Sequence, residues 1–283
     1  MSTATRLAGR AVKVAAAAAD RVVRPAPGVV VLAYHQVGGP RPGPVNVSPA
    51  RFDEHLALLA SGVAGEVVTL DAAVDALAAP APASSGRGRA AETNKVVITF
   101  DDGTADFVEH AVPRLVAHGL PATLYLATDF VESGRSFWDD GTVLSWAALE
   151  EAVATGLVSI GSHTDTHVLL DRTERAVVEA ELDRSVDLIG ARLGVVARHF
   201  AYPKALAPPA DVEQVVRDRF ASAALAGGRV NAYGRTDVGR LARTSVQVAD
   251  GTDWFARKAA GGLALEGELR RRVDRRRHAG KTR

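Results

Sequence analysis

The sequence predicts an α/β protein: a distorted parallel (β/α) barrel of about seven strands that forms a single domain. Short, continuously apolar segments, such as 28–34 (GVVVLAY) and 95–100 (KVVITF), predict strands that are buried on both faces. The apolar residues at positions 178, 182, 186, 189 and 193 have helical spacing. Because strands and helices alternate along the chain, we expect a parallel sheet that is covered by helices and closed into a barrel.

Capping signals place the expected helices. Ser48 is followed by proline, a pair typical of a helix N-terminus, and Asp71 is expected to cap the next helix. Asp171 and Glu174 have the spacing of a capping box. Pro113 predicts a restart or a kink in the helix that follows the strand at 95–100. The expected helices end near residues 60, 79, 118, 155 and 193.

Shorter apolar segments complete the expected sheet. Residues 80–94 (PAPASSGRGRAAETN) contain few apolar side chains and are rich in Pro, Ser and Gly. They predict a surface loop rather than a linker between domains. The further strands are expected at 67–70, 122–127, 157–160, 198–202, 221–225 and 244–248.

Composition excludes several classes of protein. The 283 residues are 47% hydrophobic, which suits a soluble globular chain with a full core. Cysteine is absent, so disulfides, thiolate nucleophiles and thiolate metal sites are excluded. No stretch of about 18 uncharged apolar residues occurs. Residues 14–19 are too short and too alanine-rich for a signal peptide, so we expect a cytoplasmic protein or one peripheral to the membrane.

Charge is concentrated at the two ends of the chain. The net charge is +1, with +4 on residues 1–24 and +7 on residues 270–283, which leaves −10 for residues 25–269. We therefore expect a basic N-terminal arm (1–27), a barrel domain (28–263) and a basic C-terminal tail (264–283). No nucleic-acid partner is expected. The basic ends suggest loose contact with an anionic membrane surface, and solvated termini are the alternative.

Two neighbouring carboxylates follow the strand at 95–100. Side chains of adjacent strand residues point to opposite faces. Asp101 and Asp102 can therefore share a site only where the strand ends and Gly103 lets the backbone turn. Catalytic groups of parallel α/β proteins collect at this carboxyl edge. A solvated Asp-Asp-Gly turn is the alternative interpretation.

Two histidines follow the strand at 157–160. His163 and His167 are four residues apart in SHTDTH (162–167), a spacing that lets two imidazoles reach one metal ion. A polar loop with two unrelated histidines is the alternative. One carboxylate and two imidazoles form a facial triad that leaves positions open for water and substrate. A dication would also offset the repulsion between the two close carboxylates.

With these two groups of residues, the chain resembles the polysaccharide deacetylases of carbohydrate esterase family 4, over about residues 29–263. The resemblance rests on three motifs that occur in the family's order: TFDDG at 99–103, GSHTDTH at 161–167 and HFAYP at 199–203. The supporting matches are LAYHQV at 32–37, VSPARFDEHL at 47–56 and GLPATLYL at 119–126. Together they resemble the branch of the family that is found with exopolysaccharide genes.

The resemblance implies that the barrel is catalytic and deacetylates an acetylated glycan. Asp102, His163 and His167 would hold one divalent metal ion, with zinc favoured and nickel, cobalt, iron or manganese as alternatives. Asp101 would be the general base that takes a proton from the attacking water. The backbone N–H of Lys204 would stabilise the oxyanion, and one such donor contributes about 10²–10³ in rate.

The chain departs from the family's third motif at two places. Ala201 stands where the family often has the arginine that orients the base. We hypothesise that Arg243 takes this role, and a surface arginine is the alternative. Lys204 and Ala205 replace the usual aromatic residue and glycine. This second departure leaves the substrate preference open.

Aromatic residues near the motifs are candidates for contact with sugar rings. Tyr202, Trp138 and Trp146 are the expected substrate-binding side chains. For both tryptophans, packing in the core or in a loop is the alternative. The histidines on predicted helices are expected at the surface: His55, His110 and His118.

Expulsion of an amine needs a proton donor, and the family normally takes it from a histidine on a late strand. No histidine lies between His199 and His278. His35 instead closes the first buried strand, and a closed barrel places the first and last strands side by side. The exopolysaccharide branch resembles such a permuted arrangement. His35 would then be the general acid, across the metal from Asp101. A histidine that only caps the strand end is the alternative.

The leading interpretation is a hydrolase that removes N-acetyl groups from the amino sugars of a glycan. The same metal site would suit an O-acetyl esterase, or an amide hydrolase with a smaller substrate. A catalytically inactive glycan-binding relative is the interpretation from a different class of protein. The presence of Asp101 and of all three expected metal ligands argues against it.

Overall fold

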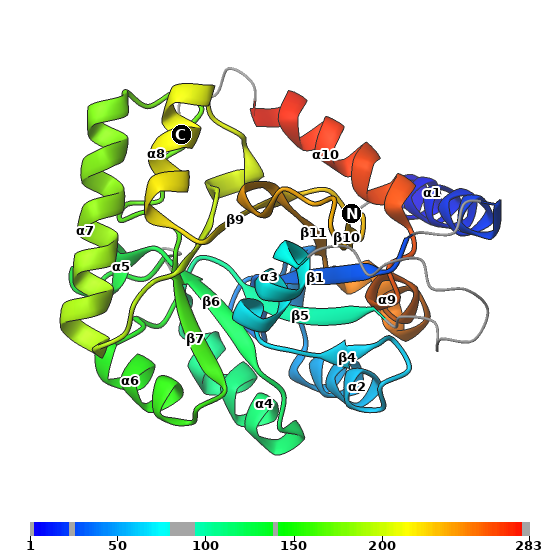
Figure 1. The fold of residues 1–283 in the computed structure, drawn as a ribbon. Coiled ribbons are helices and arrows are strands. Elements are labelled where there is room, and N and C mark those ends of the chain that lie inside the picture. The colour runs from blue at the N-terminus through cyan, green and yellow to red at the C-terminus, as the bar shows by residue number, and fades with distance from the viewer. Residues whose placement is uncertain (1–2, 23–25, 80–93, 138–140, 279–283) are drawn as a thin grey trace.

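In the computed structural model, which describes residues 3–22, 26–79, 94–137 and 141–278, seven parallel strands close into a barrel (Figure 1). The barrel closes because β1 pairs with β5 on one side and with β11 on the other. This arrangement confirms the predicted single-domain barrel. The barrel strands are β1 (Gly28–Tyr34), β5 (Lys95–Phe100), β6 (Ala122–Leu126), β7 (Val158–Ser162), β8 (His199–Ala201), β9 (Ser222–Ala226) and β11 (Leu241–Ser245).

The barrel is distorted by uneven strand lengths and by short additional strands. β7 and β8 are joined by a single residue pair, whereas β1 and β5 pair over six residues. β10 (Asn231–Ala232) pairs antiparallel with the start of β1, and β4 (Glu66–Val67) pairs parallel with β5. β2 (Gln36–Val37) and β3 (Asn46–Val47) form a separate two-stranded sheet just after β1.

Helices cover the outside of the barrel and one of its ends (Figure 1). No helix among the described residues combines the length and the apolar content that crossing a membrane requires. A π-helical turn at Phe107–Ala111 precedes α4, close to the expected irregularity at Pro113. The helices are α1 (Thr3–Val22), α2 (Pro49–Ala60), α3 (Leu70–Ala78), α4 (Val112–His118), α5 (Thr128–Glu132), α6 (Trp146–Ala154), α7 (Arg175–Leu193), α8 (Ala210–Arg219), α9 (Gly251–Ala259) and α10 (Ala264–His278).

Two of the three expected helix caps are wrong. The Ser48 side chain accepts a hydrogen bond from the Arg51 N–H and caps α2, as predicted. Thr69, rather than Asp71, caps α3. Asp171 forms an ion pair with the neighbouring arginine, and α7 begins only at residue 175 without a side-chain cap. A capping signal therefore predicted that a helix is present, but not at which residue it begins.

Alternation along the strands divides the core into two layers. Val30 and Leu32 of β1 pack with the outer helices, whereas Val29 and Val31 belong to a second cluster with residues of α3. Tyr125, Ala201 and Leu241, from three other strands, join this second cluster. Because these residues come from strands all round the barrel, the second cluster fills its interior. α3 covers one end of this interior.

The last barrel strand lies three residues earlier than expected, at 241–245 instead of 244–248. A 3-10 turn at Val248–Asp250 follows, and its side-chain capping box ends the extended segment. Arg243 therefore lies inside the strand, not before it. The division of the chain into an arm, a barrel and a tail stays a prediction.

Candidate active site

The two carboxylates lie where β5 ends beside β1. Asp101 still follows the strand, because its N–H donates to the Tyr34 carbonyl at 3.1 Å. Asp102 then adopts a left-handed backbone conformation, with φ of 75°, which aspartate tolerates better than most residues. Gly103 follows with φ of 90°. This turn brings both side chains to the same edge of the barrel, where each is 4% exposed.

The two histidines lie after β7, two strands along the barrel from β5. The His163 N–H donates to the Leu126 carbonyl at 2.9 Å, which places the ring at the carboxyl edge. Asp102 Oδ1 lies 3.6 Å from His163 Nε2 and 3.4 Å from His167 Nε2. One ligand atom from each of the three residues lies within 4.8 Å of the others. The structure thus brings together the three residues that the sequence assigned to a metal.

The states of His163 and Asp102 suit metal binding. His163 Nδ1 lies 2.7 Å from the Ala201 carbonyl oxygen, which can only accept, so Nδ1 carries the hydrogen and Nε2 presents its lone pair to Asp102. Burial lowers the pKa of His163 to about 4, so the ring is neutral near neutral pH. Burial raises the pKa of Asp102, but the hydrogen bond from His167 and the nearby histidine charges lower it more, to well below its usual range. A neutral imidazole and an ionised carboxylate are the ligand forms that a divalent cation requires.

Charged side chains form hydrogen bonds that fix the loop between the two histidines. These contacts were not predicted from the sequence. Asp165 accepts from the Thr128 hydroxyl at 2.7 Å and from Arg184 Nε at 2.8 Å. Glu181 accepts from the Thr166 N–H at 2.8 Å. Glu181 and Arg184 are three residues apart on α7, so they lie on one face of that helix. This spacing was the only signal in the sequence, and it does not indicate that the two side chains bind the loop between the histidines.

Arg243 forms a buried, bidentate ion pair with Asp101. Its two terminal nitrogens lie 2.5 and 2.8 Å from the two carboxylate oxygens, and Arg243 is 5% exposed. The guanidinium also lies over the Tyr125 ring, 5.3 Å from its centre. Burial raises the pKa of Asp101, but the charge of Arg243, with those of His163 and His35, lowers it below its ordinary value. The contact that we hypothesised between Arg243 and Asp101 is present.

His35 lies against the same carboxylate. Its Nε2 is 3.8 Å from Asp101 Oδ2, and its side chain is 31% exposed, which leaves one side open to solvent. Nδ1 is buried and has no hydrogen-bond partner among the described residues. From the sequence, we expected this ring across the metal from Asp101. The structure instead places it beside Asp101, because β1 lies directly between β5 and β11.

The third motif (199–203) and the residue after it can contribute backbone groups to the site rather than side chains. Lys204 is exposed and has φ of 53°, a conformation that is uncommon for a residue other than glycine. Tyr202 is only 1% exposed, and its ring packs edge-on against Phe200 at 5.1 Å. Tyr202 was expected to bind substrate. Its burial in the core leaves no ring face for a sugar, so we remove it from the substrate-binding candidates.

The remaining aromatic and histidine expectations have different outcomes. Trp138 lies outside the described residues. The Trp146 indole N–H donates to Glu132 at 2.8 Å, and its ring packs partly against the core, which favours the packing alternative. His55 was expected at the surface and is fully buried, stacked on Phe255 with ring centres 3.7 Å apart.

Fold and site together define a closed parallel barrel with an enzyme-like cluster of ionisable groups at its carboxyl edge. Residues 88–219 match the family model for polysaccharide deacetylases. The structure of IcaB from Ammonifex degensii is 27% identical, covers 84% of this chain and 99% of its own, and superposes with a TM-score of 0.69. Over residues 88–219 the chain is similar to the polysaccharide deacetylase family, the resemblance that its motifs predicted. The matched family model indicates deacetylation of a carbohydrate as the candidate function class.

Two less similar structures share the fold. Streptococcus pyogenes deacetylase PplD in complex with acetate is 20% identical, covers 82% of this chain and 97% of its own, and has a TM-score of 0.67. A de-N-acetylase from Aggregatibacter actinomycetemcomitans is 18% identical, covers 76% and 93% of the two chains, and has a TM-score of 0.58. No curated protein matches the sequence.

The buried pair predicts a stability effect of known sign. Arg243→Met should destabilise the fold by about 3–5 kcal/mol at neutral pH, because it leaves the Asp101 carboxylate buried without its cation. The folded-state pKa of Asp101 lies below its ordinary value. The stabilisation by the pair is therefore complete above the unfolded-state pKa, about 3.9, and is lost as pH falls through the folded-state pKa. Urea unfolding of both proteins across acidic and neutral pH measures the difference.

The control is the double variant Asp101→Asn/Arg243→Met, which removes both charges and should recover most of the lost stability. If Arg243→Met is as stable as the wild type at neutral pH, the pair is not the buried contact described here.

Proposed function

We propose that this protein is a metal-dependent hydrolase that removes N-acetyl groups from the amino sugars of a polysaccharide or related glycan. The observation that carries the proposal is the cluster of Asp102, His163 and His167 beside the ionised carboxylate of Asp101. The match of residues 88–219 to the polysaccharide deacetylase model supports a carbohydrate as the substrate class. The choice of an N-acetyl group is in keeping with the de-N-acetylase among the structural neighbours.

The three clustered residues fit one divalent metal ion. Two imidazole nitrogens and one carboxylate oxygen form a facial set that suits zinc, and also nickel, cobalt, iron or manganese. A bound dication would polarise the acetyl carbonyl and lower the pKa of the water bound to it to about 7. The Ala201 carbonyl supports this assignment, because its hydrogen bond fixes the tautomer of His163 that can ligate.

Asp101 is the general base of the proposed reaction. Its low pKa keeps the carboxylate ionised at neutral pH, so it can accept a proton from the attacking water. Arg243 holds both carboxylate oxygens and thereby fixes the direction in which the remaining lone pairs point. Arg243 is thus a positioning residue in this proposal, in place of the family's usual arginine.

His35 is the general acid that protonates the leaving nitrogen. Its ring is partly exposed and lies next to Asp101, so a proton can pass to the leaving group on the open side of the carboxylate. The backbone N–H of Lys204 would donate to the oxyanion of the tetrahedral intermediate. The exposed position of Lys204 is compatible with this role, which does not depend on its side chain.

The ligand assignment predicts the loss of metal from single variants. His163→Ala and His167→Ala should each lose stoichiometric zinc and deacetylase activity together, because two remaining ligands bind a dication much more weakly than three. His118→Ala is the matched control, since His118 lies on α4 and its nearby carboxylate belongs to Asp53. Metal content by mass spectrometry after chelation and reloading measures the effect. A variant that keeps zinc at unchanged affinity removes that histidine from the ligand set.

The role of His35 predicts a difference between two kinds of substrate. His35→Ala should lose about 10²–10⁴ in turnover on an acetylated glucosamine oligomer, because its amine leaving group needs a proton. On an activated acetyl ester the loss should be no more than about tenfold, since such a leaving group departs unprotonated. Fold and metal content should be retained. Equal losses on both substrates would show that His35 is not the acid.

A further inference from the structure

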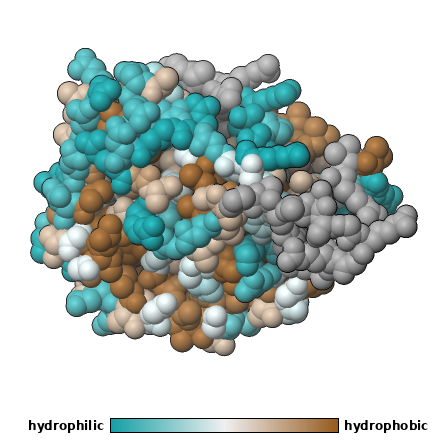
Figure 2. All heavy atoms as spheres, viewed as in Figure 1, coloured by the Kyte–Doolittle hydropathy of each residue, from teal (hydrophilic) through white to brown (hydrophobic). Residues whose placement is uncertain are grey.

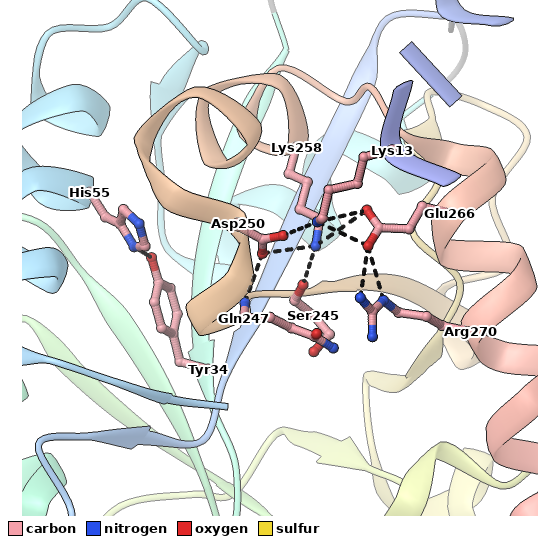
Figure 3. A network of polar contacts seen from close by, with 9 residues as sticks. All are labelled: Lys13, Tyr34, His55, Ser245, Gln247, Asp250, Lys258, Glu266 and Arg270. Atoms are coloured by element: carbon pink, nitrogen blue, oxygen red, sulfur yellow. Dashed lines mark hydrogen bonds and ion pairs between the residues drawn. The ribbon is translucent and has the colours of Figure 1, made fainter. Parts of the chain in front are cut away.

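A buried charge network fixes the orientation of α10. Glu266 of α10 is 3% exposed, and its carboxylate lies 3.0 Å from Lys13 of α1 and 3.7 Å from Lys258 of α9. Lys13 and Lys258 also contact Asp250, so two cations and two carboxylates neutralise one another. Figure 3 shows these side chains converging from α1, α9 and α10. Because every member is buried, the face of α10 that carries Glu266 points into the molecule.

One side of α10, next to the position of Glu266, exposes an apolar stripe, formed by Leu265, Leu269 and Val273. These side chains are 45%, 39% and 58% exposed. Their spacing of four residues places them along one side of the helix. Single exposed apolar residues are ordinary on a protein surface, but a stripe at helical spacing is typical of a face that binds something.

Basic residues lie beside this stripe. Arg272 is exposed within it, and Arg271 is held by Glu268 at 2.7 Å next to it. Residues 270–283 carry a net charge of +7, whereas residues 25–269 carry −10. In the sequence, positive charge is thus concentrated in the segment that begins within the apolar stripe.

The neighbouring helix also exposes apolar and basic side chains. α1 lies beside α10 at one end of the molecule (Figure 1). With Lys13 turned inward, α1 exposes Val14 (54%), Val22 (85%), Arg10 and Arg21. On the side seen in Figure 2, hydrophobic and hydrophilic residues are mixed along the edge that α10 and α1 occupy. We call the exposed faces of these two helices the terminal-helix surface.

We propose that the terminal-helix surface binds the surface of an anionic lipid bilayer. At the boundary of a bilayer, acyl chains lie next to phosphate groups. The apolar side chains of these helices can contact the acyl chains, and the arginines beside them can pair with the phosphates. Nucleic acid would use the arginines but leave the leucines exposed to water. The acidic body of a second copy would likewise leave them exposed. Of these three partners, only the boundary of a lipid bilayer would contact both the arginines and the leucines.

The buried side of α10 contacts the loop after β9, which is bonded to the last barrel strand. The backbones of α10 and of the loop after β9 are so close that a Cβ on Gly228 would lie 2.6 Å from the Gly267 Cα. The N–H groups of Gly227 and Gly228 in this loop donate to the Arg243 carbonyl, at 3.2 and 3.1 Å.

The test is co-sedimentation of the full chain with vesicles. The wild type should sediment with vesicles of phosphatidylcholine mixed with phosphatidylglycerol, not with phosphatidylcholine alone, and less at physiological than at low salt. Leu265→Glu/Leu269→Glu should weaken this binding by more than about tenfold, because it places charge at the acyl boundary. The matched control is Val177→Glu/Val196→Glu, which changes two exposed valines, 47% and 77% exposed, on and just after α7 and should bind like the wild type.

Thermal unfolding of both variants checks that the fold is retained, and Leu269→Gln/Val273→Gln provides a milder second change on the same stripe. Equal sedimentation of the wild type and both stripe variants would overturn the proposal, as would absence of binding to anionic vesicles at low salt. A wild-type dimer that becomes monomeric in the stripe variants, without vesicle binding, would show that the surface joins two copies instead. None of these outcomes depends on deacetylase activity, so the proposed function is tested separately.

Discussion

The pairing of β1 with both β5 and β11 is the constraint on which the rest of the candidate site depends. Three residues that are far apart in the sequence meet because the barrel closes at β1: His35 follows β1, Asp101 follows β5, and Arg243 lies within β11. Without closure, Arg243 would lie at a sheet edge and Asp101 would have no cation. The register also matters, because a shift of one residue would turn Arg243 to the outside of the barrel.

The resulting site separates two carboxylates that are neighbours in the chain. Asp101 faces Arg243 in the barrel interior, while the left-handed turn at Asp102 directs the second carboxylate to His163 and His167. Each carboxylate is ionised for a different reason, the first by a guanidinium and the second by imidazoles. Such pairs of like groups in different environments are how one site assigns different roles to the same residue type.

Local motifs made the cluster of Asp102, His163 and His167 predictable, because the Asp pair and the His pair each follow a strand whose apolar pattern is clear. Arg243 was predictable only as a replacement for an arginine that the third motif lacks, and the strand that carries it was placed three residues late. His55 could not be placed, because its burial depends on Phe255, two hundred residues away. The same holds for Glu181 and Arg184, whose helix gives no sign of the loop that they hold. Tyr202 was wrongly expected to bind substrate, because its side chain is buried and only the backbone of its motif lies at the site.

The most direct test of the account compares Asp101→Asn with Asp102→Asn, two adjacent and chemically identical changes. Metal content and acetate release from an acetylated glucosamine oligomer are measured for both. The account predicts that Asp101→Asn keeps one metal ion per chain and loses about 10²–10⁴ in turnover, while Asp102→Asn loses the metal itself. Equal metal loss in the two variants, or wild-type turnover in Asp101→Asn, would contradict the separation of base and ligand.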